Sequence, residues 1–145
     1  PTGFLSFNVA GLTLTSDRSE IRIDMRIPVL ADKEKLVEKL AEIASQYELT
    51  YQEFDYLAPL YVPLDSELVS TLMAIYQEKT GDESPAMSSG GATFARTMPN
   101  CVAFGALFPG ADQTEHQVNE RFHLDDLHRA MDIYAEAIYR LATTP

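Results

Sequence analysis

The feature that most constrains the fold of this sequence is a nearly continuous apolar run, Cys101–Phe108, which ends at Pro109-Gly110. Such a run is typical of a strand that is buried on both faces of a sheet. A central strand of this kind requires neighbouring strands, and the rest of the sequence does not obviously supply enough of them. We therefore expect an incomplete α/β unit whose missing strands lie upstream in a longer polypeptide. The first residue, Pro1, begins no secretory leader, which also favours a piece of something longer.

The N-terminal part of the sequence predicts a small α/β layer. Residues 4–14 predict one or two strands, and residues 21–28 alternate apolar and charged side chains, which predicts a half-buried strand. A helix is expected after Asp32, a residue suited to cap it, and residues 49–56 resemble another strand. Strand, strand, helix and strand together predict one helix packed on a sheet.

Two prolines mark a candidate boundary between two structural units. Pro59 and Pro63 bracket a short apolar segment where the composition changes. We place one unit at residues 1–58 and the other at residues 59–145.

The second unit is expected to contain two long helices. Asp65 is the expected cap of the first, which stops at Gly81. The second starts near Leu124, and helical spacing predicts its core stripe. This stripe consists of Leu127, Met131, Tyr134, Ile138 and Leu141.

Composition limits the classes of partner. The chain has 145 residues with 22 acidic and 11 basic side chains, which gives a net charge of −11. A field this negative repels phosphate groups, so we expect neither nucleic acids nor membrane surfaces as partners. No apolar run approaches the roughly 18–20 residues of a membrane-spanning helix. The single cysteine excludes an internal disulfide and Cys-rich zinc modules, and it fits a reducing cytoplasm.

His116 is the first candidate for chemistry, because it follows the C-terminal end of the predicted buried strand. Open α/β sheets place their sites at that end of their strands. A neutral imidazole is a good metal ligand, and Glu115 and Glu120 flank it in the sequence. The alternative is a solvated loop histidine, because one histidine alone makes no metal site.

Two further features are candidates for binding an anionic group. Arg26 has a planar guanidinium that matches a carboxylate, although a salt bridge with Asp24 or Glu20 is the alternative. The pair Gly90-Gly91 allows close approach of the backbone to an anion, although a tight turn is the alternative.

Four stretches carry a resemblance to a known family. They are Ile23–Val29 (IDMRIPV), Ser89–Arg96 (SGGATFAR), Val102–Gly110 (VAFGALFPG) and His116–Glu120 (HQVNE). Together they resemble the dinuclear zinc metallopeptidases of family M-twenty, in particular the bacterial dipeptidase V branch, which is related to carnosinase. The resemblance implies that residues 1–58 are the second half of a lid or dimerisation domain, a ferredoxin-like α/β layer. Residues 59–145 would be the C-terminal segment of the α/β catalytic domain.

The resemblance also implies roles for single residues. His116 would be a zinc ligand, and Asn119 and Glu120 would hold the ligand loop in shape. Arg26 would bind the C-terminal carboxylate of a dipeptide, with Gly90 and Gly91 lining the substrate through their backbone amides. The active site would contain two zinc ions, with manganese or cobalt as possible substitutes. The remaining metal ligands and the glutamate general base would lie upstream, so no catalytic residue is expected in this chain.

The expected function is therefore that of a cytoplasmic zinc dipeptidase in its full-length form, with this chain inactive alone. Its expected partners are a dipeptide substrate with free termini, the missing N-terminal part of the same polypeptide and a second copy associating through the lid. The alternative is a non-catalytic ferredoxin-like binding or dimerisation module, because a hydrolase fold can keep its scaffold and lose its chemistry.

Overall fold

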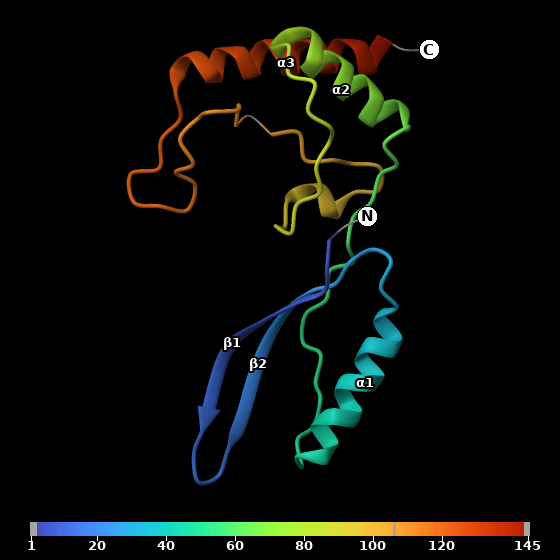
Figure 1. Ribbon diagram of the computed structural model, residues 1–145, viewed down its shortest axis with the longest axis vertical. Coiled ribbons are helices and arrows are strands. Elements are labelled where there is room, and N and C mark those ends of the chain that lie inside the picture. The colour runs from blue at the N-terminus through green and yellow to red at the C-terminus, as the bar shows by residue number, and fades with distance from the viewer. Residues whose placement is uncertain (1–2, 106, 144–145) are drawn as a thin grey trace. The chain divides into compact units, whose positions relative to one another are not determined.

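The computed structural model describes residues 3–105 and 107–143, arranged in two compact units. Unit 1 comprises Pro1–Tyr61 and Met87–Pro99, and unit 2 comprises Val62–Ala86 and Asn100–Pro145. Two residues used in the predictions lie outside the described residues. They are Pro1, the first residue of the predicted N-terminal unit, and Ala106, within the predicted apolar strand. The described elements mix strands and helices, which confirms the α/β class (Figure 1). In chain order they are β1 (Ser6–Leu14), β2 (Ser19–Arg26), α1 (Lys33–Gln46), α2 (Glu67–Thr80), the 3-10 helix η1 (Phe94–Thr97) and α3 (Leu124–Thr143).

An antiparallel hairpin of β1 and β2 begins unit 1 and confirms the two predicted strands. The turn between them is closed at Thr15, whose amide donates to the Arg18 carbonyl at 2.8 Å. The Thr15 hydroxyl oxygen in turn accepts from the Arg18 amide at 2.9 Å. A β-bulge between Val9 and Gly11 shifts the register by one residue.

The hairpin has one apolar and one polar face, because side chains alternate along each strand. The apolar face remains open: Val9 is 65% exposed and Leu14 is 68% exposed. On β2 itself, Ile21 is 49% and Ile23 39% exposed, whereas Met25 is half-buried, so the prediction of a half-buried second strand holds only in part. The apolar face is formed by Phe7, Val9, Leu12, Leu14, Ile21, Ile23 and Met25.

Helix α1 begins where the sequence predicts. The carboxylate of Asp32 accepts from the Lys35 amide at 3.1 Å and caps the first turn. The predicted strand at residues 49–56 is wrong, because this segment makes no ladder with another strand of the described residues. Its Glu53 instead forms an ion pair with Lys33 at 2.9 Å.

Helix α2 begins unit 2 and is capped by Ser66, whose hydroxyl accepts from the Val69 amide at 3.3 Å. The prediction of Asp65 as the cap is wrong. The Ser66 amide donates to the Pro63 carbonyl at 3.1 Å, so a turn from Pro63 includes Asp65 and the helix starts one residue later. Gly81 ends α2 with φ 71°, a left-handed conformation that glycine adopts readily, as predicted.

The core of unit 2 lies between α2 and α3, which are in contact (Figure 1). Ile75 at its centre is fully buried, and the alanines of α3 allow close approach of the helices. The guanidinium of Arg140 on α3 contacts both carboxylate oxygens of Glu78 on α2, at 3.1 and 2.6 Å. This interaction lowers the pKa of Glu78 below its usual range. The buried core consists of Leu72, Ile75, Phe108, Ala130, Ile133 and Ala137.

The predicted buried strand over Cys101–Phe108 is wrong, because none of its described residues is in a strand. A strand needs a neighbour to complete its hydrogen bonds, and the described part of the chain offers none here. The segment instead packs on α3 through side chains. The Tyr134 hydroxyl donates to the Phe104 carbonyl at 3.0 Å, and the two rings meet edge to face at 5.9 Å.

The core stripe of α3 also differs from the prediction. Tyr134 packs against the core, whereas Leu127, Met131 and Ile138 are exposed. The buried side chains are Ala130, Ile133 and Ala137, about a quarter of a turn round the helix. Of the predicted stripe, Leu141 is also exposed, at 36%, whereas the buried Ile133 lies outside it.

Candidate functional site

Among the described residues, His116 is the first candidate for a metal ligand. It lies in a compact loop of residues 112–121, which we call the His116 loop. Two successive turns shape it: the Gln117 amide donates to the Thr114 carbonyl, and the Glu120 amide donates to the Gln117 carbonyl, each at 3.2 Å. His116 and Asn119 occupy the third positions of these turns, with φ 63° and 64°. Such positive φ values are uncommon for residues other than glycine.

Side chains of the loop hold this conformation. The Glu120 carboxylate accepts from the His116 amide at 3.4 Å. The Thr114 hydroxyl donates to the Arg121 carbonyl and accepts from the Arg121 amide, both at 3.1 Å. Arg121 also forms an ion pair with Asp112 at 2.6 Å. The loop is therefore cross-linked by hydrogen bonds at both ends.

His116 itself is exposed, and its ring is open to a ligand from elsewhere. No group of three or more His, Cys, Asp or Glu side chains among the described residues could hold a metal ion. A zinc site needs at least three protein ligands. The described residues therefore fit one ligand position of a zinc site, that of His116, and not a complete site.

Arg26 lies at the end of β2 and is paired within its own strand. Its Nη2 atom donates to the Asp24 carboxylate at 3.1 Å, which is one of the two salt bridges that the sequence left open. Both side chains are about half exposed, at 47% and 48%, so the pair is solvent-screened. The guanidinium therefore retains donors that could reach a second carboxylate.

Gly90 and Gly91 lie in the same unit as Arg26, in an exposed segment before η1. The Gly91 amide donates to the Ser89 hydroxyl at 3.0 Å, so this amide is already occupied. A side chain at Gly90 would meet nothing within 4 Å, so the space in front of the Gly90 backbone is open. Of the two glycines, Gly90 is thus the better placed to face a ligand.

The sequence reasoning missed two residues with structural roles near these positions. Arg96 donates from its guanidinium to the carbonyls of Leu57 and Ala58 and joins the segment 87–99 to the rest of unit 1. Thr114 was not singled out, although its hydroxyl closes the His116 loop. No local pattern predicts either contact, because each partner is defined only by the folded chain.

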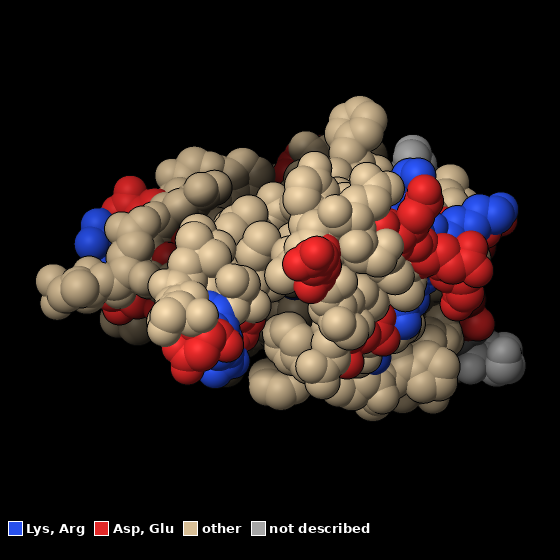
Figure 2. All heavy atoms as spheres, turned by 90° about the horizontal axis from the view of Figure 1, so that it is seen from below, with Lys and Arg blue, Asp and Glu red and all other residues tan. Residues whose placement is uncertain are grey.

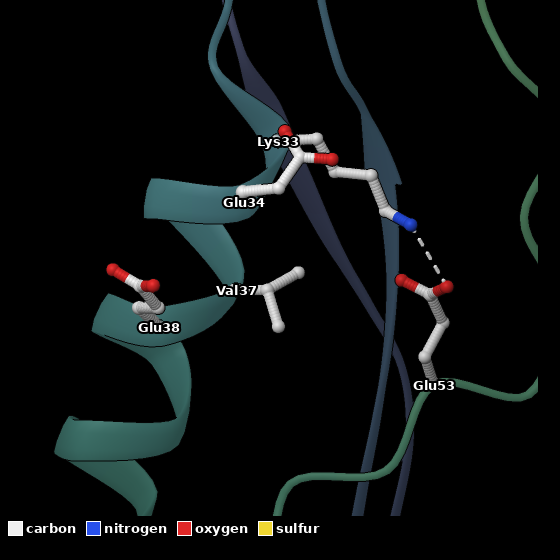
Figure 3. Close-up of a pocket in the computed structure, with 5 residues that line it drawn as sticks. All are labelled: Lys33, Glu34, Val37, Glu38 and Glu53. Carbon is white, nitrogen blue, oxygen red and sulfur yellow. Dashed lines mark hydrogen bonds and ion pairs between the residues drawn. The ribbon is translucent and has the colours of Figure 1, made fainter.

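A shallow pocket on α1 is separate from these positions (Figure 3). Figure 3 shows Lys33 extending toward Glu53, while Glu34, Val37 and Glu38 line the pocket from α1. The Glu53 carboxylate raises the pKa of Lys33, and the ammonium also lies 3.7 Å from the centre of the Tyr56 ring. The only cation of this pocket is thus already paired, and none of the predicted site residues lines it.

Acidic side chains outnumber basic ones in this chain, 22 to 11. Figure 2 shows one face on which red Asp and Glu atoms are more widespread than blue Lys and Arg atoms, in keeping with the net charge of −11. This charge disfavours polyanionic partners. Within residues 3–105 and 107–143, no helix has the length and apolar character needed to cross a bilayer.

Comparison with known proteins defines the class of the chain. Residues 6–140 match the family described as Peptidase family M20/M25/M40, and the chain belongs to this peptidase family. The resemblance inferred from the four sequence stretches is thereby confirmed.

The relatives are more specific than the family. The chain is 39% identical over 142 residues to "Putative dipeptidase YtjP" of Bacillus subtilis (strain 168), which covers 97% of this chain and 30% of that protein. It is 31% identical over 140 residues to a "Putative dipeptidase" of Staphylococcus aureus (strain USA300), which covers 96% of this chain and 30% of that protein. The chain therefore spans about 30% of the length of these relatives.

Proposed function

We propose that this chain is the C-terminal part of a zinc-dependent dipeptidase that hydrolyses dipeptides with free termini. The observation that carries the proposal is the His116 loop, which holds one exposed imidazole in an unusual backbone conformation within a chain of a peptidase family. The relatives named as dipeptidases, of which the chain spans about 30%, support an activity that belongs to a longer polypeptide.

Some residues of this chain would bind the metal, and others would bind the substrate. His116 would supply one zinc ligand, and Asn119 and Glu120 would keep its loop in shape. Arg26 would bind the free carboxylate of the dipeptide and so select its length, and Gly90 and Gly91 would line the substrate. When bound, zinc would lower the pKa of a bound water toward about 7 and polarise the peptide carbonyl.

The remaining parts of the active site would come from outside this chain. The other ligands of two zinc ions, manganese or cobalt being possible substitutes, and the glutamate general base would lie in the N-terminal part of the polypeptide. We therefore expect the isolated chain to be inactive. Residues 1–58 would belong to the lid and residues 59–145 to the catalytic domain, in a cytoplasmic enzyme that could also self-associate through its lid.

The proposal is tested by counting zinc in the full-length polypeptide. His116→Ala should reduce the bound zinc from two ions per chain to one or fewer and lower kcat by at least about 100-fold, because an open ligand position weakens the site. His128→Ala, which removes an exposed histidine of α3, is the matched control and should keep both ions. Two zinc ions per chain in His116→Ala would remove His116 from the metal site.

The alternative function is that of a non-catalytic binding or dimerisation module, which would also use the open hairpin. Its apolar face is exposed, and a two-stranded sheet of this kind is marginally stable alone. Either a partner protein or an N-terminal part of the same polypeptide would cover this face. The two functions are distinguished by zinc: a non-catalytic module would bind no zinc at His116 in the full-length polypeptide.

A further inference from the structure

We infer that Thr114 is a positioning residue, whose hydroxyl closes the His116 loop and thereby fixes the direction in which the His116 imidazole points. The inference rests on the proposed role of His116 as a zinc ligand and adds the residue that makes this ligand rigid. Thr114 would touch neither metal nor substrate.

The hydroxyl of Thr114 makes two hydrogen bonds to one residue. It donates to the Arg121 carbonyl and accepts from the Arg121 amide, both at 3.1 Å, across seven positions of the chain. Thr114 is half-buried, whereas residues 115–121 are all exposed. Both hydrogen bonds are exposed to solvent, so the closure depends on their number, two to one residue, and not on shielding from water.

The backbone of His116 needs such a constraint. Its φ of 63° is strained for a residue with a side chain, and Asn119 repeats this conformation three residues later. Strained residues persist only where the surrounding structure holds them. Both residues occupy the third positions of the two turns and lie between Thr114 and Arg121. Loss of the Thr114–Arg121 hydrogen bonds would allow the turns to open and His116 to relax to a negative φ.

A relaxed His116 would point its imidazole in another direction. The hydrogen bond from the His116 amide to the Glu120 carboxylate is longer, at 3.4 Å, than the two of Thr114, at 3.1 Å, so it is the weaker constraint. Outer residues that orient a ligand typically change metal affinity by about 10- to 100-fold when they are removed. Thr114 is therefore expected to act on zinc affinity through His116.

The test compares substitutions that separate the hydroxyl from the shape of the side chain, in the full-length polypeptide. Thr114→Val keeps the shape and removes the hydroxyl, and Thr114→Ser keeps the hydroxyl. Thr143→Val removes a hydroxyl that donates to the Tyr139 carbonyl at the exposed end of α3, and it is the matched control. Zinc affinity is measured by competition with a chromogenic chelator, and the stability of the zinc-free protein by thermal unfolding.

We expect Thr114→Val to weaken zinc binding by at least about tenfold with little change in the unfolding temperature of the zinc-free protein. Thr114→Ser and Thr143→Val should bind zinc as the unsubstituted protein does. In a cobalt-substituted protein, the visible absorption of the metal should change in Thr114→Val alone, because that spectrum reports ligand geometry.

Two results would overturn the inference. Unchanged zinc affinity in Thr114→Val, or an equal loss in Thr114→Ser, would show that the hydroxyl does not position His116. Thr114→Ala supplies a second removal of the hydroxyl if Thr114→Val does not fold, with the same expected loss. His116→Ala distinguishes this failure from that of the proposed function: if it loses zinc while Thr114→Val does not, only the role of Thr114 is wrong.

Discussion

At the residue scale, some side chains could be recognised as candidates from the sequence, whereas others make their contacts only in the folded chain. The sequence predicts His116 in a polar loop, and the structure places it there. The positive φ of His116 could not be predicted, because histidine has no strong preference for it. The contact of Thr114 with Arg121 depends on the irregular backbone of the His116 loop, and that of Arg96 with Ala58 joins segments 38 positions apart.

Arg26 offers a prediction for the substrate. In the full-length polypeptide, Arg26→Ala should raise KM for free dipeptides by about 10- to 100-fold, because a hydrogen-bonded charge contributes about 1.5–3 kcal/mol. Steady-state kinetics would measure it, with kcat changing less than KM. Dipeptide amides, which lack the carboxylate, should show no such difference between the two proteins.

The control for Arg26 is its neighbour on the same face of β2. Arg22 is also ion-paired, through its Nε atom to Glu20 at 2.7 Å, so Arg22→Ala removes a similar charge and pair. It should leave KM unchanged. An equal rise in KM for both substitutions would indicate a general effect of positive charge and would rule out a specific anchor at Arg26.

At the element scale, helices could be predicted and two of the strands could not. Helix α1 follows from the Asp32 cap and an apolar stripe within one segment of sequence, so local information suffices. A strand at residues 49–56 or 101–108 requires a partner strand, and the described part of the chain holds only the β1–β2 ladder. The exposed apolar side chains of α3 likewise meet no covering surface among the described residues.

The cap at the start of α2 can be tested by substitution. Ser66→Ala should lower the free energy of unfolding by about 1 kcal/mol, because it removes the hydroxyl that caps the Val69 amide. Asp65→Ala should change it by less than about 0.5 kcal/mol. Urea unfolding of the full-length polypeptide, followed by circular dichroism, measures both. The opposite order would return the cap to Asp65.

At the scale of the whole molecule, buried side chains are distributed unevenly between the two units. Unit 2 has a connected core, whereas Ala95 is the one buried apolar residue among the described residues of unit 1. The sequence predicted that strands were missing, but it could not indicate which surfaces they leave open. In unit 1, the structure leaves the apolar face of the hairpin exposed.

The isolated 145-residue chain is therefore expected to bind a hydrophobic dye and to self-associate in size-exclusion chromatography. Hydrogen exchange should be faster in β1 and β2 than in α2 and α3, because the hairpin lacks a covered face.

A pair of variants tests whether the hairpin is responsible. The double substitution of Val9→Thr and Ile23→Thr on the apolar face should reduce dye binding, whereas Asn8→Thr on the polar face should not. A monodisperse chain without dye binding, with the hairpin protected as well as α2, would contradict this expectation. It would favour a self-sufficient binding module.

The contact between α2 and α3 has a consequence for the integrity of the polypeptide. Arg140 and Glu78 are 62 positions apart, and the exposed segment at residues 87–93 lies between them in the sequence. Cleavage of one peptide bond in that segment by a foreign protease would cut the covalent chain but leave the helices joined by Ile75, Ala130 and their neighbours. The nicked molecule would then behave as two fragments under denaturing conditions and as one particle under native conditions.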